Sequence, residues 1–70
     1  EISYSVFRGS YVSLIIYDML GREVANLIHE SKQPGEYSAT WKADGEPSGV
    51  YFYRLVAGDN VTTKKMVLMR

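Results

Sequence analysis

The sequence predicts an all-β fold, a small antiparallel β-sandwich of about six to seven strands. Several short segments alternate apolar and polar residues, which is the pattern of strands that bury one face. These segments are rich in β-branched and aromatic residues, and clusters of Gly, Pro, Asn and Asp separate them at intervals of about 8 to 12 residues. The chain of 70 residues contains no cysteine, so one domain must be stabilised by its core without disulfides.

Two strands are expected before the first hairpin. The first, residues 2–6, alternates apolar residues with serines and is followed by a turn at Arg8-Gly9-Ser10. The second, residues 11–17, directs Val12, Leu14 and Ile16 to one face and is expected to be central in its sheet.

The next strand is the least clearly defined one. Gly21, in the connection that follows residue 17, can adopt the positive φ that a tight hairpin or bulge requires. Residues 23–28 are interpreted as a strand, although Val24, Leu27 and Ile28 fit a helical turn nearly as well. Residues 29–33 are polar and are expected to form a loop that leads into the Pro34-Gly35 turn.

The second half of the chain contains three further expected strands. Residues 37–41 alternate cleanly up to Trp41, and residues 42–48 form a loop. Residues 50–56 are the strongest strand segment, in which Arg54 must face water because an unpaired buried charge is costly. Tyr51, Tyr53 and Leu55 therefore face the core. A hairpin turn at 57–60 leads to a last strand, residues 61–69, whose facing the pattern leaves open.

Composition excludes several classes of function. Eight basic and eight acidic residues cancel and are scattered, which disfavours a nucleic-acid partner. No apolar run approaches the roughly 20 residues that span a membrane, and the first four residues do not resemble a signal peptide. The length of 70 residues allows a single domain, and because the chain starts inside an alternating pattern without a Met, we expect it to be a piece of a larger protein.

Candidate catalytic and ligand-binding groups are sparse. His29 is the only histidine, and no Cys is present to complete a metal site with it. Asp18, Asp44 and Asp59 occur in three turns, where aspartate commonly bonds to the local backbone. Nucleophile elbows and glycine-rich phosphate loops are absent. We therefore expect no enzyme, no metal and no cofactor.

Aromatic and lysine residues admit a functional and a structural interpretation. Six tyrosines and one tryptophan suggest a carbohydrate platform, yet Trp41, Tyr51 and Tyr53 are on faces assigned to the core. Lys64 and Lys65 point to opposite faces of the last strand, and lysines there commonly protect a sheet edge from unwanted pairing. Unprotected edges would allow a homodimer through strand pairing.

Three stretches carry a resemblance to a known family. They are residues 12–24 (VSLIIYDMLGREV), 48–55 (SGVYFYRL) and 64–68 (KKMVL), in this order and spacing. Together they resemble the type A C-terminal sorting domain of the type IX secretion system of Bacteroidetes, which is similar to the immunoglobulin-like domain of the flagellar hook-capping protein. The resemblance covers nearly the whole chain and implies that the sandwich is immunoglobulin-like and that residues 1–70 are the C-terminal piece of a larger protein.

The resemblance implies a non-catalytic domain that directs a secreted cargo through the outer-membrane translocon. It implies as partners the translocon, a sortase-like peptidase that cleaves the domain off, and upstream cargo domains, with passage through the periplasm to the medium or cell surface. A structural module of the hook-capping type and an accessory carbohydrate-binding domain are the alternatives. The residues that the resemblance assigns to recognition are Asp18, Gly21, Gly49, Tyr51, Leu55, Lys64 and Lys65.

Overall fold

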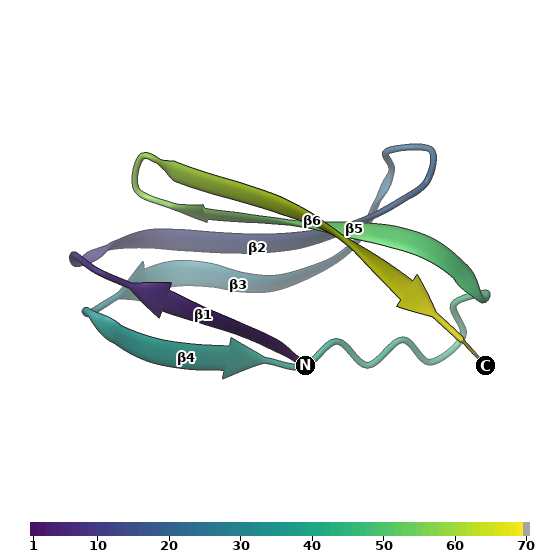
Figure 1. The fold of residues 1–70 in the computed structure, drawn as a ribbon, viewed down its shortest axis with the longest axis horizontal. Coiled ribbons are helices and arrows are strands. Elements are labelled where there is room, and N and C mark those ends of the chain that lie inside the picture. The colour runs from purple at the N-terminus through teal and green to yellow at the C-terminus, as the bar shows by residue number, and fades with distance from the viewer. Residues whose placement is uncertain (70) are drawn as a thin grey trace.

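A computed structural model describes residues 1–69 and contains six strands in two layers (Figure 1). Strands β1 and β4 form a two-stranded sheet, and the other strands form a four-stranded sheet in the order β3-β2-β5-β6. All pairs are antiparallel, so the predicted all-β sandwich is confirmed, with residues 11–17 in an interior strand. The strands are β1 Ile2–Val6, β2 Ser10–Asp18, β3 Glu23–Lys32, β4 Gly35–Ala39, β5 Gly49–Ala57 and β6 Asn60–Leu68.

The core lies between β1 and the inner face of the larger sheet. Val12, Leu14 and Ile16 of β2 are completely buried. From the other layer, Ile2 packs in one cluster with Leu14 and Ile16, while Tyr4 and Val6 pack in a second cluster with Val12. Both strands therefore bury every second residue, as the sequence predicts, because the opposite sheet covers one face of each strand.

The last strand faces the core with its two even-numbered apolar residues. Met66 and Leu68 are half-buried and pack against the first cluster, because they lie opposite Tyr51 and Gly49 of β5. Val67 is 62% exposed, and Met69, which follows the strand, is 84% exposed. The pairing with β5 thus decides a facing that the sequence pattern left open.

Two bulges explain the ambiguous pattern of β3. Its register against β2 shifts twice, so that Leu27 and Val24 are extra residues without a partner across the ladder. Each extra residue resets the alternation, and Val24, Leu27 and Ile28 all contact the core from an extended strand. The helix-like spacing of these side chains is therefore a property of a twice-bulged strand.

The loop predicted for residues 29–33 is wrong over most of its length. His29 to Lys32 continue β3, where His29 pairs with Ser13 and Ser31 pairs with Tyr11. Polar residues are compatible with a strand at this position, because β3 is an edge of the larger sheet and this end of it is largely exposed. The His29 ring meets Tyr11 edge-to-face, with centroids 5.7 Å apart.

The strand predicted for residues 37–41 lies two residues earlier in the chain, at Gly35–Ala39. β4 ends at Ala39, and Trp41 lies in the long connection to β5. Trp41 still packs against the core from this connection, with its ring 5.0 Å from that of Tyr51. The side chain therefore packs against the core as predicted, but it is half-buried and lies outside the strand.

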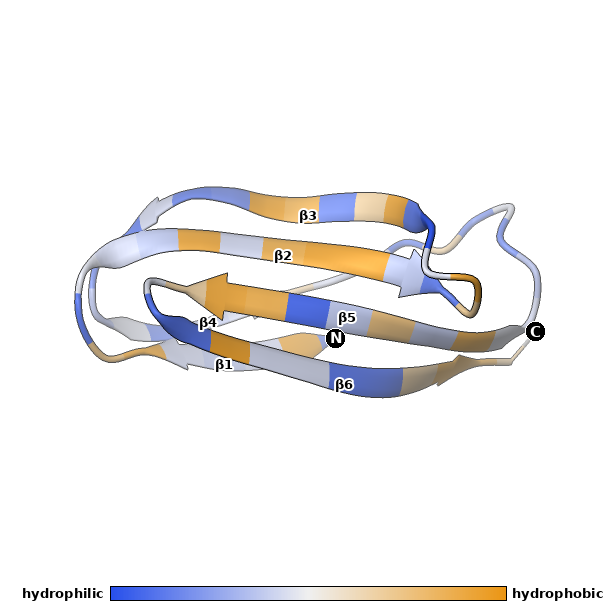
Figure 2. Cartoon of the chain, turned by 90° about the horizontal axis from the view of Figure 1, so that it is seen from above, coloured by the Kyte–Doolittle hydropathy of each residue, from blue (hydrophilic) through white to orange (hydrophobic). Residues whose placement is uncertain are grey.

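The facing of β5 agrees with the prediction from Arg54. Tyr51 is buried, Tyr53 and Leu55 pack against the core, and Arg54 is exposed. Figure 2 shows one hydrophilic segment in β5, among neutral and hydrophobic ones, and a hydrophilic segment in the middle of β6. That segment contains the two adjacent lysines of the strand.

Candidate functional site

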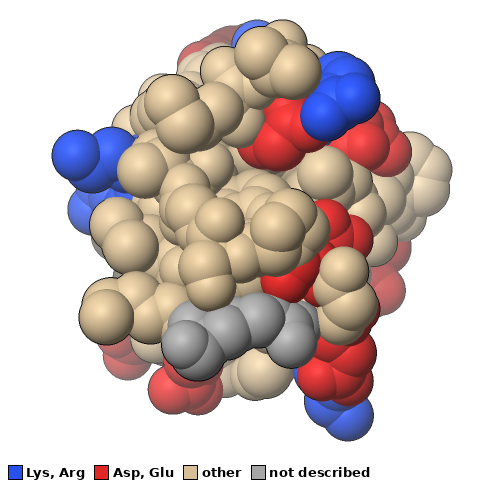
Figure 3. All heavy atoms as spheres, turned by 90° about the vertical axis from the view of Figure 1, so that its right-hand side faces the viewer, with Lys and Arg blue, Asp and Glu red and all other residues tan. Residues whose placement is uncertain are grey.

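The motifs of residues 12–24 and 48–55 meet at one end of the sandwich. β2 and β5 are antiparallel neighbours, and Asp18 at the end of β2 pairs with Tyr51 near the start of β5. The β2–β3 loop, residues 19–22, and the connection that leads into β5 consequently border the same groove. We call this region the loop end; Figure 3 views the molecule from this side.

Asp18 organises the β2–β3 loop through its side chain and its backbone. Its Oδ1 accepts hydrogen bonds from the backbone N–H groups of Leu20 and Arg22, both at 2.9 Å. Its Oδ2 accepts a charge-assisted bond of 2.9 Å from Nε of Arg22. Backbone bonds from Asp18 N to Arg22 O and from Gly21 N to Asp18 O close the loop. The aspartate is the local turn-forming residue that the sequence predicts.

The same contacts stabilise the charged form of this carboxyl group. The hydrogen bond from the Arg22 backbone amide is the largest cause that lowers the pKa of Asp18 below its usual value, and desolvation opposes it. The Arg22 side chain and the Leu20 amide lower the pKa further. Asp18 is therefore an anion at neutral pH whose charge is balanced within the loop.

Two glycines at the loop end have conformations that other residues rarely adopt. Gly21 has φ of 83° and Gly49 has φ of 154°. A Cβ at either position would meet no heavy atom within 4 Å, so the backbone angle and not lack of space selects glycine. Both residues shape the chain and offer no side chain to a ligand.

Tyr51 fixes the other wall of the loop end. Its hydroxyl donates a hydrogen bond of 2.6 Å to the carbonyl oxygen of Pro47. Its ring is only 4% exposed and meets Trp41 edge-to-face at an interplanar angle of 66°. The side chain thus ties the connection before β5 to the core, and it is a packing residue.

Met19 and Leu20 are prominent residues of the loop end that sequence reasoning did not select. Their exposed fractions are 70% and 78%, although both side chains are large and apolar. They help to line an open groove of about 490 Å³ whose other wall includes Pro47 and Val50. The signal in the sequence was two large apolar residues in a tight turn, where small and polar residues are usual.

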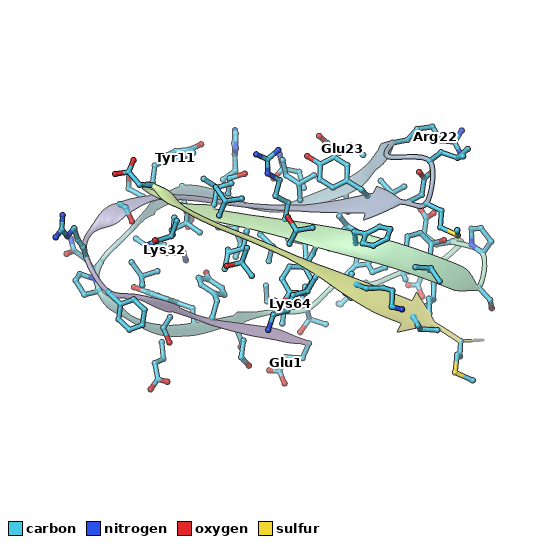
Figure 4. The ribbon with its side chains drawn as sticks, turned by 45° about the horizontal axis from the view of Figure 1, so that its top comes forward. Glu1, Tyr11, Arg22, Glu23, Lys32 and Lys64 are labelled. Carbon is cyan, nitrogen blue, oxygen red and sulfur yellow. The ribbon has the colours of Figure 1, made fainter. Side chains whose placement is uncertain are left out.

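The other predicted recognition residues lie elsewhere. Leu55 faces inward on β5, opposite Leu14, and packs in the core. Lys64 and Lys65 are exposed in the middle of β6, opposite Tyr53 and Phe52 respectively. They point to opposite faces as expected, and Lys64 lies far from Arg22 and Glu23 of the loop end (Figure 4).

The described residues contain no group of three or more His, Cys, Asp or Glu side chains that could hold a metal ion. No helix in residues 1–69 is long and apolar enough to cross a membrane.

Trp41 and Tyr53 are only partly exposed and Tyr51 is buried, so these aromatics do not form an exposed row for stacking on sugars. Of the seven predicted recognition residues, the exposed ones are Gly21, Lys64 and Lys65.

Comparison with known proteins assigns a family. A family model described as secretion system C-terminal sorting domain matches residues 1–69. The match covers both sheets and all three motifs that carried the resemblance. Searches of curated proteins and of solved structures found no match.

Proposed function

Because the chain belongs to the family of secretion system C-terminal sorting domains, we propose that it directs an upstream cargo through the type IX outer-membrane translocon as a folded recognition unit. Domains of this family are sorting signals for type IX secretion and are in general non-catalytic. A protein that carries one is exported to the cell surface or secreted. The observation that carries the proposal is the extent of the family match, which includes every strand of the sandwich.

Residues that are neighbours at the loop end are far apart in the sequence. This supports recognition of the folded domain and not of a linear peptide. Asp18 and Tyr51 are paired across two strands, and the loop end exists only when β2 and β5 are in register. A short linear segment presents neither this register nor the groove. Folding is therefore part of the proposed signal.

We assign the seven predicted residues to three roles. Asp18, Gly21 and Gly49 shape the backbone at the loop end, and their effect on sorting is indirect. Tyr51 and Leu55 act through packing. Lys64 and Lys65 offer exposed cationic groups, so direct contact with the translocon is proposed for them.

The route and fate of the cargo follow from the proposed function. The cargo passes through the periplasm, and a sortase-like peptidase removes the domain after translocation. The chemistry of the whole protein then belongs to the cargo domains upstream. Mass spectrometry of the secreted cargo tests this point, since its mature form should lack residues 1–70.

A reporter fusion tests the sorting function. The chain is fused behind a periplasmic reporter in a bacterium with a functional type IX system, and reporter activity is measured in the medium, on the surface and inside the cell. We expect the reporter outside the cell with the unaltered domain and inside with Leu14→Asp, because a charge at a completely buried position disrupts the core. Retention of a well-folded unaltered fusion would contradict the proposal.

A further inference from the structure

Two large apolar side chains are held away from the core by a loop that is itself well fixed. Met19 and Leu20 lie between Asp18 and Arg22, whose hydrogen bonds close the loop on both sides of them. Their side chains are 70% and 78% exposed. The ordered loop therefore holds this apolar surface in water. A loop that only reverses the direction of the chain does not need exposed apolar side chains.

The facing wall of the groove is fixed as well. The Tyr51 hydroxyl holds the carbonyl of Pro47 at 2.6 Å, and Trp41 packs on the buried Tyr51 ring. Pro47 and Val50 line the groove from this side. A partner that enters would therefore meet two ordered walls and lose little conformational entropy of the domain on binding.

The charge around the groove is negative. Within residues 1–69, the lining contains the three carboxylates of Asp18, Glu23 and Glu46 and the single guanidinium of Arg22. Arg22 is bonded to Asp18, which leaves Glu23 and Glu46 without an ion-pair partner within residues 1–69. Acidic side chains gather along one side of uncharged surface at this end (Figure 3), although the whole chain is neutral.

We propose that the loop end docks an extended, basic segment of a partner protein, in which an apolar side chain packs against Met19 and Leu20 while a Lys or Arg meets Glu23 and Glu46. This inference rests on the proposed sorting function, and the partner is a component of the translocon. Charge complementarity selects this occupant over a bilayer surface, because anionic lipids would be repelled by the two carboxylates.

Export of the reporter fusion provides the functional test. We expect Met19→Ser combined with Leu20→Ser to reduce export about tenfold or more, since central apolar anchors dominate binding. Phe7→Ser is the matched control, because Phe7 is 87% exposed and follows β1, at the opposite end of β2. It should export normally. Equal export of the double variant and the unaltered domain overturns the docking inference and leaves sorting intact.

Charge reversal gives a second, independent variant. Glu23→Lys combined with Glu46→Lys should also reduce export about tenfold. Glu36→Lys on the exposed surface of β4 is its control. Thermal unfolding of each isolated domain shows whether a variant is folded, and a folded reversal variant that exports normally overturns the inference.

Crosslinking identifies the occupant in the same cells. A photoreactive phenylalanine analogue replaces Leu20 in one fusion and Phe7 in the other, and the adducts are identified by mass spectrometry. We expect position 20 alone to capture a basic segment of a translocon component. Capture of lipid or of a second copy of this chain overturns the inference. If the unaltered fusion stays inside the cell, the proposed function fails and the docking inference fails with it.

Discussion

The Asp18 carboxylate accepts hydrogen bonds from both the backbone amide and the Nε atom of Arg22, each at 2.9 Å. A single side chain thereby fixes the geometry of the loop and neutralises the charge that lies four residues further on. The loop end of the sandwich depends on this pair, because Met19 and Leu20 lie between the two residues.

The first prediction concerns pH. The folded-state pKa of Asp18 is lowered, so its contribution to stability is present above the unfolded pKa of about 3.9 and is lost as pH falls through the folded pKa. We expect Asp18→Asn to lower the melting temperature at pH 7 and to lower it less as the pH is taken below 4. Thermal unfolding across pH measures this. An equal loss at every pH would contradict the role of the charge.

The second prediction concerns backbone strain at the hairpin. Gly21→Ala should destabilise the domain by about 1 to 2 kcal/mol, because an L-residue pays this cost in the left-handed region and φ is 83° at this position. Gly9→Ala is the control, since no positive φ occurs there and its Cβ would meet only the Lys32 carbonyl oxygen at 3.8 Å. Denaturant titration of both variants measures the difference, and similar losses would argue against strain.

The third prediction separates the hydroxyl of Tyr51 from its ring. Tyr51→Phe removes the bond to Pro47 and should cost about 1 kcal/mol, whereas Tyr51→Ala should cost about 3 to 5 kcal/mol through the cavity that it leaves. Tyr37→Phe is the comparison, because its hydroxyl donates to Gln33 at an exposed site. We expect that loss to be smaller in denaturant titration. A neutral Tyr51→Phe would mean that the bond does not fix the loop.

The fourth prediction concerns the lysines of β6. Lys64→Glu combined with Lys65→Glu should leave the free energy of unfolding within about 1 kcal/mol, since both side chains are exposed and make no ion pair within residues 1–69. Export of the reporter fusion should fall if these ammonium groups contact the translocon. Lys42→Glu, in the connection before β5, is the control. Normal export of the folded double variant would remove both lysines from the recognition surface.

The fifth prediction concerns self-association. Among the strands of residues 1–69, β6 pairs only with β5 and leaves a nine-residue edge open, so we propose that two copies pair along it at high concentration. β3 is the less suitable edge because its two bulges distort the ladder. Light scattering after size exclusion should show a mass that rises with concentration. Thr63→Pro should abolish this rise, and a constant monomer mass for the unaltered chain would contradict the proposal.

The alternation of apolar and polar residues predicted those strands that have one face covered by the other sheet. β1 and β2 have apolar residues at every second position and bury them, and in β5 the inward Tyr51 is buried while Tyr53 and Leu55 pack against the core. The charge of Arg54 was enough to orient β5, because burial of an unpaired guanidinium is costly in any tertiary arrangement. Where bulges reset the pattern in β3, the same reasoning could not separate strand from helix, and it ended the strand before His29.

The sequence by itself determined an all-β chain, its central strand and the residues of the core, since these follow from local alternation and the cost of burying charge. Only the tertiary structure decided which face of β6 is inward and that Asp18 lies beside Tyr51. Register between strands distant in the chain depends on long-range packing, which no local pattern contains. For that reason the groove at the loop end, with Met19 and Leu20 on one wall, is visible only in the folded domain.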